Sequence, residues 1–238
     1  MTSPGTRPEP GPTEGRKLAM QTQELARTHD VIDPAILYFG TPVVLLSTVS
    51  AAGAVNLMPM SSAFWLGHTG VLGMGARSQT YRNLADTGEC VLNLPSAALV
   101  SQVNRLALTT GRDPVPPRKA SAGYRYEPDK FGRAGLTPVP ADTVRPPRAA
   151  ECPVNLEARV TDTYELEKDD SGTGAGLVAV EVAITRVHVH PDIRLPGTET
   201  RIDPDAWRPL IMSFQYFYGL GDQLHPSKLA TIDEEWYR

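Results

Sequence analysis

Short strand-like runs dominate the chain after residue 30, and this pattern most restricts the folds open to it. The β-branched run Val43–Val49 has the length of one buried strand. Ser50–Gly53 offers turn residues before a second apolar run, Ala54–Met58, so we expect a β-hairpin. Strands alternate nowhere with long helices, which favours a barrel over a doubly wound parallel sheet.

The next part of the chain predicts two more strands and two helices. Val71–Gly75 and Cys90–Leu94 read as short strands, separated by a small polar helix over about Tyr81–Thr87. A second helix is expected to begin after Ser96, which can cap it, and to continue at helical spacing until Gly111.

The second half predicts a long loop and a second pair of strands. Residues 112–150 are rich in proline, which is typical of an extended surface loop that could wall a pocket. Val154–Val160 and Leu177–His190 resume strand character, with an exposed loop over Glu165–Gly176 between them. Because the apolar alternation changes phase near Arg186, we expect a bulge or bend there.

Composition narrows the class of protein. The 238 residues are 41% hydrophobic and 21% charged, with a net charge of -4, so we expect one globular domain and no nucleic-acid partner. The absence of an 18-residue apolar run or a basic leader predicts neither a membrane span nor a signal peptide. The two cysteines, Cys90 and Cys152, suggest buried thiols in a cytoplasmic protein.

We divide the chain into three parts. Residues 1–28 are rich in Pro and Gly and are expected to form a disordered tail. Residues 29–200 would form the folded domain, with 112–150 as its long loop, and residues 201–238 an aromatic extension that packs on the domain or on a partner copy.

The strongest local candidate site is Arg77-Ser78-Gln79-Thr80, between a glycine-rich strand end and a helix start. A guanidinium, two hydroxyls and the free N–H groups of the first helical turn suit an anionic phosphate. Ordinary helix capping by Ser78 or Thr80, with a solvated Arg77, is the alternative interpretation.

A second candidate is the segment that begins at Asn56. We expect its strand to break at Pro59 and to run into Ser61 and Ser62, which would free backbone donors and acceptors for a planar heterocycle. The alternative is a plain turn in which both serines bond their own backbone.

The C-terminal region and two histidines are weaker candidates. Tyr216, Phe217 and Tyr218 could cover a substrate cleft that His225 helps to shape, or they could pack in the core or a dimer seam. His188 and His190 share one strand face, but no clear third ligand is near them in the sequence, so we predict no metal site.

Several short motifs occur together in a fixed order. They are Gly53-x-x-Asn56, Pro59-x-Ser61-Ser62-x-Phe64, Arg77-Ser78-Gln79-Thr80, Asn83-Leu84, Thr87-Gly88-Glu89, Asn93-x-Pro95, Asp129-Lys130-Phe131, Gly135-Leu136 and Glu151-Cys152-Pro153-Val154. Over roughly residues 30–190 this series resembles the flavin reductase-like, FMN-binding split-barrel family.

The resemblance implies a mainly β, Greek-key-like split barrel of about six strands with few helices, which dimerises and holds FMN at the dimer interface. Asn56, Arg77, Ser78 and Thr80 match the positions that bind the phosphate and ribityl chain, and Asn83 one that supports them. The implied FMN-binding set is Asn56, Met58, Pro59, Met60, Ser61, Ser62, Ala76, Arg77, Ser78, Thr80 and Asn83.

The implied function is hydride transfer from NADH or NADPH onto FMN, which is either kept or released to a partner monooxygenase. No catalytic side chain is assigned, because the flavin carries the chemistry itself. One alternative is an FMN-dependent tailoring oxidoreductase or oxygenase, with an organic substrate enclosed by the 112–150 loop. Another is a flavin-binding dimer without catalytic activity.

Overall fold

The computed structural model describes residues 29–168 and 174–237. The chain divides into two compact units, Met1–Leu37 and Tyr38–Arg238. In the first unit, the described residues 29–37 contain no helix or strand, and the predicted tail 1–28 lies outside the described residues. The elements discussed below all belong to the second unit.

The second unit is built mainly from strands. These are β1 Phe39–Pro42, β2 Val44–Val49, β3 Val55–Met60, β4 Ala63–Leu66, β5 Thr69–Gly75, β6 Glu89–Leu94, β7 Thr109–Thr110, β8 Arg125–Tyr126, β9 Pro138–Val139, β10 Arg148–Ala149, β11 Val154–Lys168, β12 Gly174–Val189, β13 Leu210–Ser213 and β14 Tyr216–Gly219. The helices are α2 Gln79–Thr87, α3 Val100–Asn104, α4 Pro117–Ser121 and α5 Lys130–Ala134, with 3-10 turns at Ala97–Leu99, Pro191–Ile193, Lys228–Thr231 and Glu234–Tyr237. Within the described residues, no helix has the length and apolar character needed to cross a membrane.

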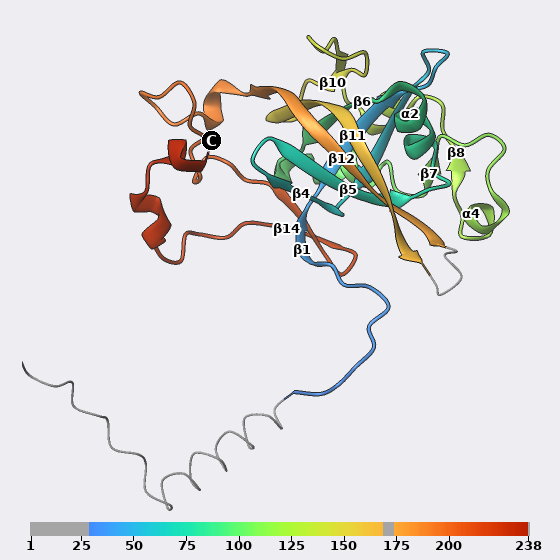
Figure 1. The fold of residues 1–238 in the computed structure, drawn as a ribbon, viewed down its shortest axis with the longest axis horizontal. Helices are drawn as coiled ribbons and strands as arrows, with labels where there is room; N and C mark the ends of the chain where they lie inside the picture. The colour runs from blue at the N-terminus through green and yellow to red at the C-terminus, as the bar shows by residue number, and fades with distance from the viewer. Residues whose placement is uncertain (1–28, 169–173, 238) are drawn as a thin grey trace, which may run out of the picture. The chain divides into compact units, whose positions relative to one another are not determined.

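Seven strands form the principal sheet, in the order β3-β2-β6-β11-β12-β5-β4 (Figure 1). Every neighbouring pair in this sheet is antiparallel. The two edge strands, β3 and β4, follow one another in the sequence. Between them, the carbonyl of Ser62 accepts a hydrogen bond at 2.7 Å from the backbone N–H of Gly73 on β5. This mainly β architecture with few helices is the predicted split barrel, with one strand more than the six expected.

The first hairpin confirms the sequence analysis, with one correction. β2 and β3 pair around the Ser50–Gly53 turn, and Leu46 lies opposite Met58. The strand does not break at Pro59, however, but continues to Met60 with Pro59 opposite Leu45. Because β3 is an edge strand, a residue without an N–H can occupy it without removing a bond from the ladder.

The two predicted helices differ in how well they form. α2 begins at Gln79, two residues earlier than expected, and ends at Gly88, whose φ of 66° is the left-handed conformation of a helix stop. The second helix reaches only Asn104 rather than Gly111. Thr109 and Thr110 pair instead with β8, so β-branched residues at the end of the helical pattern are used in a strand.

The long hairpin β11–β12 also differs from expectation at its tip. Residues 165–168 and 174–176, predicted as loop, belong to the two strands. The predicted irregularity near Arg186 is confirmed. The pairing passes from Glu157 opposite Arg186 to Ala158 opposite Ile184, which leaves Thr185 as the extra residue of a bulge.

Two hydrophobic cores lie on opposite faces of β2. Val44 and Leu46 point into the barrel core, whereas Leu45 points into a second core under α3 and α5. The barrel core also contains Leu72, Met74, Leu84, Cys90, Leu92, Leu156, Ala158, Val178, Val180 and Val182. The second core contains Val43, Leu57, Leu99, Val103, Leu106, Phe131, Ala134, Leu136, Ala149, Cys152 and Leu210.

The segment 112–150 is not the extended loop that its prolines predict. It holds α4, β8, α5, β9 and β10, and it contributes Phe131 and Leu136 to the second core. Apolar residues spaced between the prolines anchor the segment, so its fold depends on burial as well as on turn residues.

Two buried carboxylates tie this segment to the sheet. Glu157, with 0% exposure, accepts hydrogen bonds from the backbone N–H groups of Asp142 (2.8 Å) and Thr143 (2.6 Å) and contacts His188 Nε2 at 2.7 Å. Burial raises the pKa of Glu157, but these hydrogen bonds outweigh it and lower the pKa to about 2. Glu89 likewise pairs with Arg145 at 3.0 Å.

Candidate functional site

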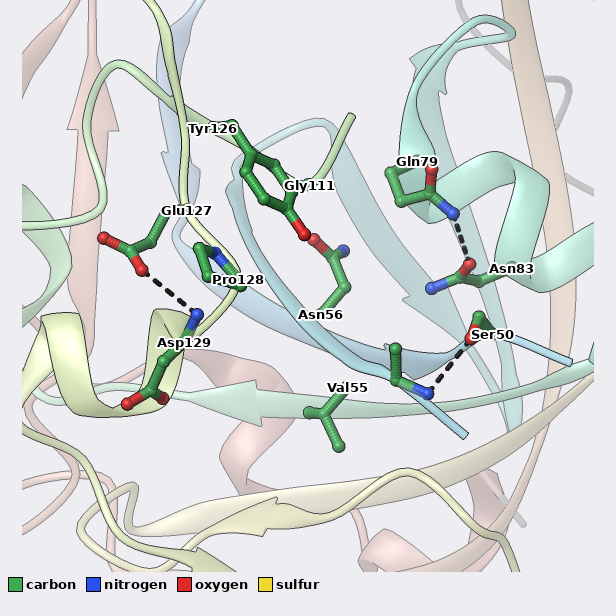
Figure 2. Close-up of a pocket in the computed structure, with 11 residues that line it drawn as sticks. Ser50, Val55, Asn56, Gln79, Asn83, Gly111, Tyr126, Glu127, Pro128 and Asp129 are labelled. Atoms are coloured by element: carbon green, nitrogen blue, oxygen red, sulfur yellow. Dashed lines mark hydrogen bonds between the residues drawn. The ribbon is translucent and has the colours of Figure 1, made fainter. Parts of the chain in front are cut away.

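A cavity of about 260 Å³ opens between the first hairpin, α2 and the segment that follows β7 (Figure 2). Its lining combines amides, carboxylates and a phenol with the apolar side chains of Ala54, Val55 and Pro128. The lining residues are Ser50, Ala54, Val55, Asn56, Gln79, Asn83, Gly111, Tyr126, Glu127, Pro128 and Asp129.

The wall formed by α2 is fixed by a chain of amides and hydroxyls. Gln79 Nε2 donates to Asn83 Oδ1 at 2.7 Å, and Asn83 Nδ2 donates to Thr48 Oγ1 on β2 at 3.0 Å. Asn83 is buried, so these bonds hold its amide in one orientation against the sheet.

Asn56 on β3 presents an unsatisfied acceptor at this cavity. Its side chain is only 5% exposed, and Nδ2 donates to Thr80 Oγ1 at 2.9 Å. Oδ1 is buried without a hydrogen-bond partner among the described residues. A Cβ placed on Gly111 would lie 2.5 Å from this oxygen, so the glycine keeps the space beside it open. A buried acceptor without a donor costs about 1–3 kcal/mol, which a ligand N–H could recover.

The opposite wall comes from the residues between β8 and α5. Figure 2 shows Tyr126, Glu127, Pro128 and Asp129 on one side of the cavity, with Gln79 and Asn83 on the other. Glu127 Oε1 accepts from the backbone N–H of Asp129 at 3.0 Å. Asp129 Oδ1 in turn accepts from Gly132 N at 2.9 Å and caps α5. Both carboxylates are therefore bonded to the backbone of their own turn.

The predicted phosphate-binding residues lie at the start of α2. Ser78 is the N-cap, and its Oγ accepts from Tyr81 N at 3.0 Å, as the capping interpretation requires. Thr80 is buried and reaches the cavity through its bond to Asn56. Arg77 is exposed, and its guanidinium has no partner among residues 29–168 and 174–237. Phosphate binding at these residues stays a prediction.

The remaining predicted FMN residues do not line the cavity. Met58, Met60 and Ala76 pack against the barrel core. Ser61 is buried, and Ser62 Oγ lies 3.3 Å from the Tyr38 hydroxyl. Pro59 shares β3 with Asn56. Among the predicted positions, Asn56 and Asn83 line the cavity directly.

The C-terminal aromatic residues belong to a separate three-stranded sheet, β1-β13-β14. Tyr216 and Tyr218 are exposed on β14, while Phe217 packs on the second core. His225 is exposed, with Nδ1 2.6 Å from the Pro226 carbonyl. None of these residues lines the cavity described above, so their role at a substrate cleft stays a prediction.

The two strand histidines have different surroundings. His190 accepts from Asp192 N through Nδ1 at 3.3 Å. His188 Nε2 lies near Glu157 and Asp142, and one ligand atom from each of the three falls within 4.8 Å of the others. The fold therefore brings to His188 two carboxylates that the sequence did not place near it, and both carboxylate oxygens of Glu157 also accept hydrogen bonds.

The sequence did not predict an individual role for the wall formed by Tyr126, Glu127, Pro128 and Asp129. These residues lie inside the 112–150 segment, which was expected to wall a pocket. The available signal was Asp129-Lys130-Phe131, one of the motifs of the family resemblance.

Comparison with known proteins shows the family of the chain. The sequence model described as flavin reductase like domain matches residues 36–217. Uncharacterized protein YdfE of Bacillus subtilis (strain 168) is 37% identical over 193 residues, which cover 81% of this chain and 90% of that protein.

Two solved structures show the same fold. The flavoredoxin of Desulfovibrio vulgaris (Miyazaki F) superposes with a TM-score of 0.68 at 21% identity and covers 85% of this chain and 99% of its own. Nitrilotriacetate monooxygenase component B from Bacillus cereus gives a TM-score of 0.63 at 19% identity and covers 95% and 100%. With a family match over most of its length and a split-barrel fold, the chain belongs to the flavin reductase like domain family.

Proposed function

We propose that this protein binds FMN and reduces it with NADH or NADPH. The observation that carries the proposal is the buried Asn56 Oδ1, an acceptor without a donor at a cavity that Gly111 keeps open. Family membership supports flavin as the ligand. The hydroxyl groups of the flavin's ribityl chain are donors that match the free acceptor, in keeping with the position of Asn56 in the family resemblance.

The residues around the cavity fit such a ligand. Asn56, Gln79 and Asn83 would hold polar groups of the flavin, and Arg77, Ser78 and Thr80 would hold its phosphate near the first turn of α2. The cavity, at about 260 Å³, lies just below the range of about 300–1,000 Å³ usual for small-ligand pockets. Part of the flavin would therefore extend beyond it, where a second copy of the chain in a homodimer would cover it.

The mechanism needs little acid or base chemistry from the protein. Bound flavin supplies hydride and electron transfer. The protein's own residues would hold the ribityl chain through Asn56, fix that amide with Thr80, and border the ligand with the 126–129 wall. A cytoplasmic location and delivery of reduced flavin to a partner monooxygenase belong to the same proposal.

One observation favours the alternative of a tailoring oxidoreductase or oxygenase. The segment after β7 is folded and contributes Gly111 and the residues 126–129 to the lining of the cavity. Such a wall could enclose an organic substrate against the flavin, whereas release of free flavin needs an open path.

The visible absorption spectrum of the purified protein with FMN tests the proposal. We expect the flavin bands to shift on binding and to bleach anaerobically after NADH or NADPH is added, at rates of at least about one turnover per second. Binding without bleaching by either donor would favour the tailoring alternative. An unchanged FMN spectrum and unquenched flavin fluorescence would refute the proposal.

A further inference from the structure

A second group of polar side chains gathers on the outer face of the long hairpin. Leu156 and Ala158 of β11 belong to the barrel core, so Glu157 between them points to the opposite face of the sheet. Glu157 lies opposite Arg186 in the register of β11 and β12, and His188 is two residues further along β12. Because side chains two residues apart on a strand share a face, Glu157, Arg186 and His188 all lie on this outer face.

The segment between β9 and β10 covers the same face. Glu157 Oε1 accepts from Asp142 N at 2.8 Å, and Oε2 accepts from the N–H and the hydroxyl of Thr143 at 2.6 and 2.5 Å. His188 Nε2 lies 2.7 Å from Glu157 Oε1 and 4.0 Å from Asp142 Oδ2. One imidazole and two carboxylates, from three separate stretches of the chain, thus meet with one ligand atom of each within 4.8 Å of the others.

Glu157 is a buried carboxylate without a lysine or arginine beside it. It is 0% exposed, and its partners among the described residues are two backbone N–H groups, one hydroxyl and the His188 imidazole. Arg186 pairs with Asp142 instead, with 3.5 Å between Nη1 and Oδ2. Buried charges in proteins are normally paired or bound to a metal ion, because an unpaired charge is costly to remove from water. Two carboxylates beside one guanidinium leave an excess of negative charge that a divalent cation would neutralise.

The spacing of the three groups suits an ion of the size of Zn²⁺. Two ligand atoms bound to zinc at tetrahedral angles lie about 3.3 Å apart. The distances of 2.7 and 4.0 Å from His188 Nε2 to the two carboxylates lie on either side of that value. The Asp142 side chain is 51% exposed and His188 21%, which leaves room for adjustment, a path for the ion and a position for water. An imidazole with two carboxylates and no thiolate is a ligand set that zinc accepts.

We propose that His188, Glu157 and Asp142 bind one Zn²⁺ ion, which joins the segment between β9 and β10 to the long hairpin. On binding, His188 Nε2 releases to solvent the proton that it donates to Glu157, and its lone pair binds the ion in place of that hydrogen bond. The bonds from Thr143 to Glu157 Oε2 orient the carboxylate towards the ion. None of these residues lines the cavity, so the inference does not depend on flavin binding.

Calorimetric titration of the full-length protein with ZnCl₂ tests the site, after metal has been removed with EDTA and the EDTA by dialysis. We expect one Zn²⁺ per chain and, at about 100 times the Kd, a rise in unfolding temperature of roughly 5–10 °C. His188→Gln and Asp142→Asn should each bind zinc about tenfold more weakly or worse, because even residues that only orient a ligand contribute that much.

Two further variants separate the site from other contributions. His190 Nδ1 lies 3.5 Å from Asp192 Oδ2 in an exposed pair next to the hairpin, and His190→Gln should leave zinc affinity unchanged. Arg186→Gln removes the cation beside Asp142 and should strengthen zinc binding by about twofold to fivefold. Asp142 is exposed and its backbone N–H is kept, so Asp142→Asn should unfold in EDTA at the wild-type temperature.

Three outcomes would overturn the inference. The first is wild-type protein that binds no zinc. The second is equal zinc affinity in wild type, His188→Gln and Asp142→Asn. The third is a loss of affinity confined to His190→Gln, because the ion would then bind the exposed pair of His190 and Asp192.

Discussion

At the scale of the residue, the candidate site depends on Asn56, whose buried side-chain oxygen lacks a donor and lies beside the space that Gly111 leaves open. Asn56 could satisfy both ends of its amide only if a donor entered beside Gly111. The cost of an unsatisfied buried oxygen is therefore part of the free energy available to a ligand.

Gly111→Ala tests this arrangement. The new Cβ would stand 2.5 Å from Asn56 Oδ1 and 3.2 Å from Gln79 Cγ, so it would occupy the space proposed for the flavin's ribityl chain. We expect FMN affinity, measured by quenching of flavin fluorescence, to fall about tenfold or more. Gly221→Ala, with nothing within 4 Å of its new Cβ, is the control. Equal affinities in both variants would place the flavin elsewhere.

Lys130 predicts an unusual dependence of stability on pH. Its pKa is about 8 in the folded protein and 10.5 when unperturbed, so between these values the unfolded chain binds more protons than the folded one. Stability should rise with pH over that interval, by up to about 3 kcal/mol. Urea unfolding at pH 8 and pH 10.5 would measure the gain.

The matched variants isolate this effect. Lys130→Met should lack the rise, whereas Lys228→Met, at an exposed lysine, should keep it. Identical pH profiles for wild type and Lys130→Met would show that Lys130 is not buried as a charged group.

At the scale of the element, Glu157 fixes the segment after β9 to the long hairpin. Glu157→Gln keeps the shape of the side chain but removes its charge, and we expect a loss of about 1–3 kcal/mol at pH 7. The pKa of Glu157 is about 2 in the folded state against a usual 4.5, so its contribution is present above pH 4.5. That contribution disappears as pH falls towards 2.

Denaturant titrations at pH 7 and pH 3 would measure this loss. The difference between wild type and Glu157→Gln should shrink at the lower pH, and the exposed Glu199→Gln should match wild type at both. A constant difference would mean that the hydrogen bonds to Glu157 do not depend on its charge.

The elements that the sequence predicts correctly depend on local signals. The β2–β3 hairpin and the stop at Gly88 follow from turn and cap residues. The phase change in β12 predicted the bulge at Thr185. The helix expected up to Gly111 failed because Thr109 and Thr110 pair with β8, a long-range partner that periodicity does not reveal.

Local sequence signals also predict part of the candidate site. Asn56 and Asn83 stand in motifs of the family resemblance and line the cavity. Glu127 and Asp129 line the cavity because the 112–150 segment folds into short helices and strands, whereas its prolines predict a loop. The buried state of Lys130 depends on the second core around Phe131 and had no signal in composition.

At the scale of the whole molecule, exposed apolar side chains favour self-association. Phe64 and Leu66 are exposed on β4, an edge strand of the principal sheet, and Tyr216 and Tyr218 are exposed on β14. Edge strands and apolar patches of this kind are common association surfaces.

We expect light scattering after size exclusion to give about twice the chain mass of 25.8 kDa. Phe64→Lys should shift the protein towards the single-chain mass, because a lysine on an edge strand opposes pairing. Leu224→Lys, at a still more exposed apolar residue outside the sheets, is the control. A mass of 25.8 kDa at all concentrations would contradict the dimer.

The position of β2 between the two cores has a consequence for how the domain opens. All six residues of β2 are buried, and their alternate side chains serve opposite cores. Neither core can come apart while β2 stays in place, so both should melt in a single cooperative transition. The backbone amides of Val44–Val49 should be among the last to exchange with deuterium, and ligand binding next to β3 should slow that exchange across both cores alike.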